Sequence, residues 1–155
     1  MGMIHNIGIA GLKVAAPPDQ IRTVLGSCVG IAIYDRAARL GGLAHVILPS
    51  STRGAGDRRK FADTAIDWLL DELRKAGAAR ARLAAKIAGG AKMFGSATTT
   101  LIGDRNIEAV RERLRFHRIP LEGEDVGGDK GRKMTFDPAT AVVTVQAIGA
   151  ELRSL

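Results

Sequence analysis

Two side chains in this sequence could act together as a nucleophile and a base. Cys28 is the only cysteine, and His45 is one of three histidines. A cysteine thiolate is a strong nucleophile, and a neighbouring imidazole activates it by accepting its proton. The same imidazole can then protonate a departing amine. This pair of residue types suits the hydrolysis of an amide or ester through a covalent thioester.

The elements around these residues predict how they would meet. β-Branched and apolar residues from 21 to 34 predict a long strand with a kink or bulge at Gly26. Residues 35–38 resemble a turn, and residues 39–48 predict the return strand of a hairpin.

The hairpin predicts a register for the pair. With a turn of residues 35–38, Tyr34 would face Arg39 and Cys28 would face His45. Directly opposed residues share one face of a sheet with Cβ atoms about 5 Å apart, which allows a thiol–imidazole hydrogen bond. A bulge at one of the neighbouring glycines would shift this register.

Nearby residues could support the chemistry. Gly26 leaves backbone N–H groups uncovered, so Gly26 and Ser27 are candidates for stabilising an oxyanion. Thr23 and Ser27 carry hydroxyls that could hold the imidazole in one tautomer. The residue types alone also fit a buried structural cysteine and a structural histidine. The spacing of the two residues does not decide between this structural interpretation and the catalytic one.

The remaining segments predict the fold class. Strands are also expected over 4–14, 82–88, 121–126, 132–136 and 141–148, and helices over 60–76 and 103–117. About eight strands and two main helices predict an α/β fold of the α+β layered sandwich type, with a mixed, largely antiparallel sheet. Residues 1–155 are expected to form a single domain, with a polar loop over 50–58.

Composition and charge narrow the function classes. The formal net charge is +7, but no aromatic residues interleave the basic ones as in nucleic-acid-binding motifs, so a basic surface for an acidic protein partner fits equally well. No signal peptide is expected at the N-terminus, and no apolar run approaches the roughly 20 residues of a membrane span. A cytoplasmic protein without membrane insertion is therefore expected.

Other motifs predict neither a metal nor a cofactor. His5 and His117 lie far in sequence from any acidic cluster with metal-ligand spacing, so structural roles are expected for both. Residues 127–132 contain glycines and a lysine but lack the spacing of a phosphate-binding loop. The pairs Gly89-Gly90 and Gly127-Gly128 could be tight turns or walls of a cleft.

Longer motifs resemble one known family. Residues 23–30, Thr-Val-Leu-Gly-Ser-Cys-Val-Gly, and residues 41–49, Gly-Gly-Leu-Ala-His-Val-Ile-Leu-Pro, resemble the signature of CheD, the chemoreceptor glutamine deamidase family. Further resemblances follow in order at 61–66, 86–94, 102–106 and 124–133. The resemblance covers residues 7–148, nearly the whole chain.

The resemblance implies a function and a site. Family members convert glutamines of methyl-accepting chemoreceptors to glutamate, some also hydrolyse receptor methyl esters, and the fold is similar to that of glutamine-deamidating toxins. The family's catalytic cysteine corresponds to Cys28, its histidine to His45 and its supporting threonine to Thr23. In some family sequences this threonine lies one residue upstream, where this chain has Arg22.

The resemblance also implies partners and alternatives. Chemoreceptors would be the substrate, and a CheC-type phosphatase would be a further partner. The chief alternative is a regulatory protein that binds the phosphatase or the receptor without catalysis. A nucleic-acid-binding domain is a third hypothesis, which predicts strongly salt-dependent binding.

Overall fold

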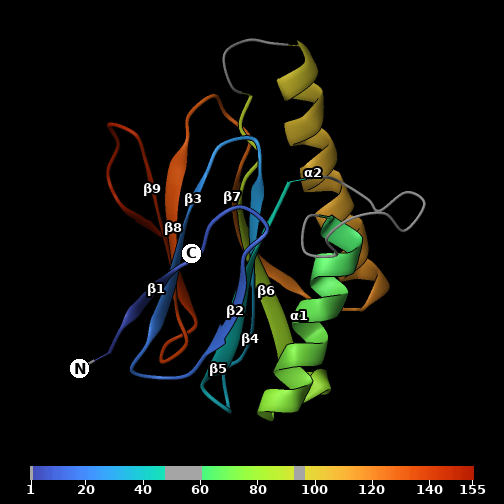
Figure 1. Cartoon of the computed structure of the whole chain (residues 1–155), viewed down its shortest axis with the longest axis vertical. Helices are drawn as coiled ribbons and strands as arrows, with labels where there is room; N and C mark the ends of the chain where they lie inside the picture. The colour runs from blue at the N-terminus through green and yellow to red at the C-terminus, as the bar shows by residue number, and fades with distance from the viewer. Residues whose placement is uncertain (1, 48–60, 93–96) are drawn as a thin grey trace.

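The computed structural model describes residues 2–47, 61–92 and 97–155, which form two five-stranded sheets and two α-helices (Figure 1). The outer sheet has the order β1 (Ile4–Asn6), β3 (Gln20–Leu25), β8 (Arg132–Asp137), β9 (Val142–Ala147) and β10 (Arg153–Ser154). The central sheet has the order β2 (Leu12–Ala15), β5 (Leu40–Val46), β4 (Val29–Asp35), β6 (Leu83–Gly89) and β7 (Leu121–Val126). The helices are α1 (Ala62–Ala76) and α2 (Ala97–Phe116), and a short 3-10 turn covers Arg80–Arg82.

The three layers follow from the faces that each element buries. Both helices pack on one face of the central sheet, and the outer sheet covers its other face (Figure 1). Strands β4 and β6 are therefore buried along their whole length, which explains their nearly continuous apolar sequences. Ile31 and Ile33 face the helices, whereas Ala32 and Tyr34 face the outer sheet. Two cores result, one on each side of the central sheet.

The predicted fold class is confirmed, with more strands than expected. Six strand pairings are antiparallel, and β1–β3 and β6–β7 are parallel. The segments 4–14 and 21–34 were each predicted as one strand. Each is two strands that belong to different sheets, because the chain changes layer at its glycines. The loop predicted over 50–58 lies outside the described residues.

Helix α2 begins earlier than the predicted start at Gly103. This glycine lies inside the helix, and a Cβ on it would lie 2.8 Å from the carbonyl oxygen of Gly90. The glycine therefore marks a close approach between helix and turn, and not the end of a helix as its residue type suggests.

The predicted hairpin register is wrong by two residues. Tyr34 pairs with Gly41, and His45 pairs with Gly30 instead of Cys28. Asp35 ends β4 as a paired residue, and its carboxylate accepts a hydrogen bond of 3.2 Å from the N–H of Ala38. The turn therefore starts one residue later than predicted. A shift by an even number of residues keeps each side chain on its predicted face of the sheet.

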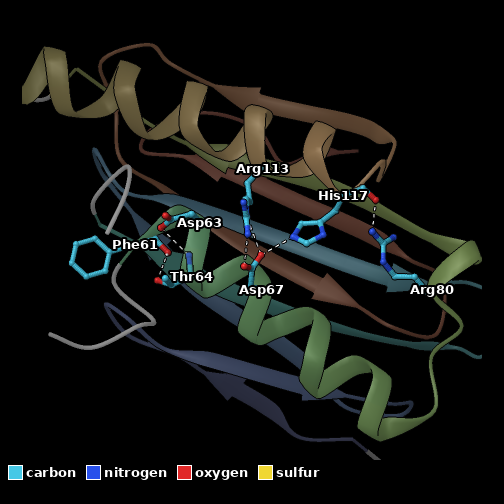
Figure 2. A network of polar contacts seen from close by, with 7 residues as sticks. All are labelled: Phe61, Asp63, Thr64, Asp67, Arg80, Arg113 and His117. Carbon is cyan, nitrogen blue, oxygen red and sulfur yellow. Dashed lines mark hydrogen bonds and ion pairs between the residues drawn. The ribbon is translucent and has the colours of Figure 1, made fainter. Parts of the chain in front are cut away.

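A polar network joins the C-terminal part of α2 to α1. Figure 2 shows the Asp67 carboxylate between the side chains of Arg113 and His117. Its Oδ1 accepts hydrogen bonds from Arg113 Nε at 2.9 Å and from His117 Nε2 at 2.6 Å. His5 likewise contacts Asp19 at 2.8 Å. Both histidines thus make structural contacts. No helix in the described ranges is long and apolar enough to cross a membrane.

Replacing Asp67 tests how much this network stabilises the helix pair. Asp67→Ala leaves Arg113 and His117 without their shared acceptor, so we expect the free energy of unfolding to fall by about 1 kcal/mol. Asp71→Ala is the control, because Asp71 pairs only within the exposed surface of α1 and should cost less than about 0.5 kcal/mol. Equal losses for the two variants in urea titrations would contradict this assignment.

Candidate active site

Cys28 lies at the point where the chain passes between sheets. Residues 26–28, here named the Cys28 turn, connect the end of β3 in the outer sheet to the start of β4 in the central sheet. The Cys28 side chain is half-buried and packs against the core between the sheets.

Each carbonyl of the Cys28 turn accepts a hydrogen bond from a different donor. The Gly26 oxygen accepts from Ala91 N at 2.9 Å, and the Cys28 oxygen accepts from Gly90 N at 2.8 Å. The Ser27 oxygen accepts from the side-chain Nδ2 of Asn106 at 3.3 Å. The turn is therefore held on its carbonyl side by β6, the turn after it and α2.

The turn brings the two glycine pairs beside the cysteine. Gly89 has a φ of 106°, and a Cβ there would lie 2.2 Å from the Cys28 oxygen, so no other residue fits. The N–H of Gly127 donates to the Gly89 oxygen at 2.9 Å, and Gly128 also has a positive φ. The prediction of tight turns is confirmed by the positive φ values, and the prediction of cleft walls stays a prediction.

His45 points from the central sheet toward the outer sheet. Its partner across β4, Gly30, faces the inter-sheet core, where a Cβ would lie 2.6 Å from the sulfur of Met134. Opposed residues share a face, so His45 lies on this side of the sheet as well. There its Nδ1 lies 2.7 Å from Oγ1 of Thr23, which sits on the inner face of β3. A hydrogen bond between the two layers results.

The threonine defines the tautomer of the histidine. Thr23 Oγ1 also lies 2.9 Å from the carbonyl oxygen of Ile7, which can only accept a hydrogen bond. The hydroxyl therefore donates to Ile7 and accepts from Nδ1–H of His45. This leaves the lone pair on Nε2, and Nε2 is buried without a hydrogen-bond partner among the described residues. An imidazole in this state is prepared to accept a proton at Nε2.

Burial shapes the protonation of both candidate catalytic groups. It lowers the pKa of His45 to about 4, because the charged imidazolium would lose its hydration. It also raises the pKa of the Cys28 thiol, which a hydrogen bond from its own backbone N–H offsets only in part. Burial thus works against a thiolate–imidazolium ion pair, in which the pKa of the thiol would be lowered. Both shifts favour the uncharged forms, and Nε2 of His45 has no hydrogen bond to the thiol.

The N–H side of the Cys28 turn is open. Among the described residues, no carbonyl accepts a hydrogen bond from the N–H of Ser27 or Cys28. The N–H of Cys28 instead bonds to its own sulfur, so these two N–H groups are candidates for stabilising an anionic oxygen only if that bond is exchanged. The contact of Gly26 that the structure shows is through its carbonyl oxygen, which accepts a hydrogen bond from the N–H of Ala91.

The structure brings most of the sequence candidates together and adds one. Thr23, and not Arg22, contacts the histidine, while Arg22 bonds to Thr135 on the outer sheet. Sequence analysis missed Asn106, which is fully buried on α2. The signal was present, because Asn106 lies four residues before Val110 on the apolar stripe of the helix, where a polar residue is unexpected.

A half-buried thiol, a neutral imidazole and an orienting hydroxyl on an α+β fold form the set of groups found in cysteine hydrolases. The family model described as "CheD chemotactic sensory transduction" matches residues 47–147. A Syntrophomonas wolfei protein named probable chemoreceptor glutamine deamidase CheD is 46% identical over 96% of this chain and 96% of its own. The chemoreceptor glutamine deamidase CheD of Halalkalibacterium halodurans is 44% identical, again over 96% of both chains. The chain belongs to the CheD family.

A comparison of structures matches the YfiH protein of Bacillus licheniformis. The TM-score is 0.41 and the identity 17%, over 68% of this chain and 46% of that chain.

The lowered pKa of His45 predicts a pH dependence of stability. The unfolded chain takes up a proton at this histidine near pH 6.5, whereas the folded chain resists protonation until about pH 4. The free energy of unfolding should therefore fall as the pH is lowered through this window, by on the order of 2 kcal/mol between about pH 7 and about pH 4.5. Urea titrations across this range measure the loss.

His45→Gln provides the comparison for this prediction. The variant lacks the titrating group, so its stability should change much less across the same window. Wild-type and variant curves that run parallel would show that His45 does not cause the pH dependence.

Proposed function

We propose that this chain deamidates glutamine side chains of methyl-accepting chemoreceptors, with Cys28 as the nucleophile and His45 as the base. The observation that carries the proposal is Nε2 of His45, which is buried and has no hydrogen-bond partner among the described residues. Because Thr23 accepts from Nδ1–H, Nε2 carries no proton, and it lies beside the core that Cys28 contacts. The names of the family's relatives support the substrate.

The first half of the reaction forms a thioester. Nε2 of His45 accepts the proton of the Cys28 thiol as the sulfur attacks the carboxamide carbon of the glutamine. The oxygen of the carboxamide becomes negatively charged and is stabilised by the N–H groups of Ser27 and Cys28, the latter released from the sulfur as the sulfur attacks. The tetrahedral intermediate collapses when His45 returns the proton to the nitrogen, and ammonia leaves.

The second half releases glutamate. His45 Nε2 takes a proton from a water molecule, whose oxygen attacks the thioester carbon. The carbon–sulfur bond breaks, the sulfur regains the proton, and the side chain departs as a carboxylic acid that ionises. Throughout, Thr23 accepts from Nδ1–H, so the proton moves only at Nε2.

The neutral resting pair fits this sequence of steps. Since burial disfavours both the thiolate and the imidazolium, proton transfer has to coincide with attack on the bound substrate. A receptor methyl ester fits the same steps with methanol as the leaving group. A CheC-type phosphatase partner rests on the family resemblance alone and stays a prediction.

The direct test uses a cytoplasmic fragment of a chemoreceptor as the substrate. Wild-type protein should release ammonia and raise the fragment's mass by about 1 Da for each glutamine, the amide-to-acid change expected of hydrolysis at a cysteine. Cys28→Ala should remain folded and be inactive, because no other cysteine can replace the nucleophile. Activity retained in this variant would disprove the nucleophile. Receptor binding without turnover in the wild type would favour the regulatory alternative.

The hydroxyl of Thr23 is tested by two variants. Thr23→Val keeps the shape but removes the acceptor for Nδ1–H, so kcat should fall by about 100-fold, the lower range for general acid–base catalysis, with little change in KM. Thr23→Ser keeps the hydroxyl and should retain most of the activity. If the valine and serine variants have equal kcat values, the threonine does not orient His45.

A further inference from the structure

Asn106 is a polar side chain within the buried face of α2. It is fully buried, and its neighbours Ile107 and Val110 belong to the core between the helices and the central sheet. Gly103, one turn earlier, brings the helix against the carbonyl oxygen of Gly90. This side of α2 thus reaches the residues that hold the Cys28 turn.

The amide of Asn106 bonds to two separate segments of the site. Its Nδ2 donates to the Ser27 oxygen at 3.3 Å and to the Ile47 oxygen at 2.8 Å. Ser27 directly precedes Cys28, and Ile47 follows the end of β5, which carries His45. Both oxygens belong to carbonyls and can only accept, so the nitrogen of the amide has to lie on this side.

We propose that Asn106 is a positioning residue that sets the distance between the Cys28 turn and the end of β5, and so aligns the Cys28 sulfur with Nε2 of His45. This inference rests on the proposed function, in which the two side chains exchange a proton. A displacement of about 1 Å between reacting groups can cost about 100-fold in rate.

The main-chain contacts align the site only as far as the β4–β5 ladder, whose last pair is Val29 and Val46. Gly90 N and Ala91 N tie the Cys28 turn to the segment after β6, and neither reaches the end of β5. Among the described side chains, that of Asn106 bridges the Cys28 turn and Ile47. Its Oδ1 stays buried without a partner in the described part of the chain. The Asn106 amide therefore donates two hydrogen bonds through Nδ2 but leaves its Oδ1 buried and unpaired among the described residues. An apolar side chain would pack the helix without this unpaired acceptor, so packing alone does not explain an asparagine here.

Two variants of Asn106 separate hydrogen bonding from packing. Asn106→Ala removes the amide, and Asn106→Asp keeps its shape while replacing the nitrogen that donates both bonds by an oxygen that only accepts. Val110→Ala is the control, since it opens a cavity in the same face of α2 one turn away, without contact to the turn. We expect kcat on the receptor fragment to fall by about 100-fold in Asn106→Ala, with KM nearly unchanged, and Val110→Ala to keep the wild-type kcat. Asn106→Asp should lose activity as well.

Alkylation of Cys28 gives a readout that needs no deamidase activity. Cys28 is the only cysteine, so iodoacetamide uptake reports on this thiol alone. In Asn106→Ala the turn should loosen, and the midpoint of the alkylation pH profile should move down toward the ordinary thiol value of about 8.5. Val110→Ala should keep the wild-type profile. Equal profiles and equal kcat values in Asn106→Ala and Val110→Ala would overturn the proposal.

The wild-type protein supplies a test that does not depend on the folding of any variant. The side-chain amide protons of Asn106 should exchange slowly with solvent in NMR spectra, and their signals should shift when Cys28 is alkylated. Fast exchange, or signals that do not respond to alkylation, would overturn the proposal. If alkylation and NMR agree with it while the wild-type protein has no deamidase activity, the proposed function fails and the positioning role stands.

Discussion

The site depends on a short passage from one sheet to the other. The chain leaves the outer sheet at Leu25 and enters the central sheet at Val29, so residues 26–28 belong to neither ladder. Their carbonyls would be unpaired at the edge of a core, and an unpaired buried carbonyl costs about 1–3 kcal/mol. The protein satisfies them with donors from the turn after β6 and from α2. The same bonds fix the shape of the turn that carries Cys28.

His45 belongs to the central sheet, and this position explains the lowered pKa and the fixed tautomer of its imidazole. The side chain of His45 extends into the space between the sheets, where its ring has one hydrogen-bond partner among the described residues, Thr23 on the facing sheet. An imidazole in this environment is neutral and has one free nitrogen, which an exposed histidine would lose to water. The layered fold thus provides both the orientation and the low basicity of the candidate base.

Much of this arrangement could be predicted from the sequence, and the rest could not for physical reasons. Periodicity located the strands and both helices, and the motifs around Cys28 and His45 identified the pair. Periodicity does not say to which sheet a strand belongs, so the separation of β3 from β4 was missed. The predicted register is wrong because Asp35 belongs to the strand and not to the turn, although its carboxylate accepts a hydrogen bond from the N–H of Ala38 in the turn. The apolar stripe of α2 marks Asn106 as unusual, but it does not say what the amide bonds to, because the two acceptors lie about 60 and 80 residues earlier in the chain.

The order of these contacts along the chain has a consequence for synthesis. Cys28 and His45 emerge early, but the donors that hold the Cys28 turn are Gly90, Ala91 and Asn106, which the ribosome adds much later. Contacts so distant in sequence form late in folding, because a long loop has to close first. A nascent chain that has exposed its thiol therefore lacks the geometry to use it. The Cys28 turn is complete only when α2 docks, so the first half of the chain does not by itself contain all the contacts of the candidate site.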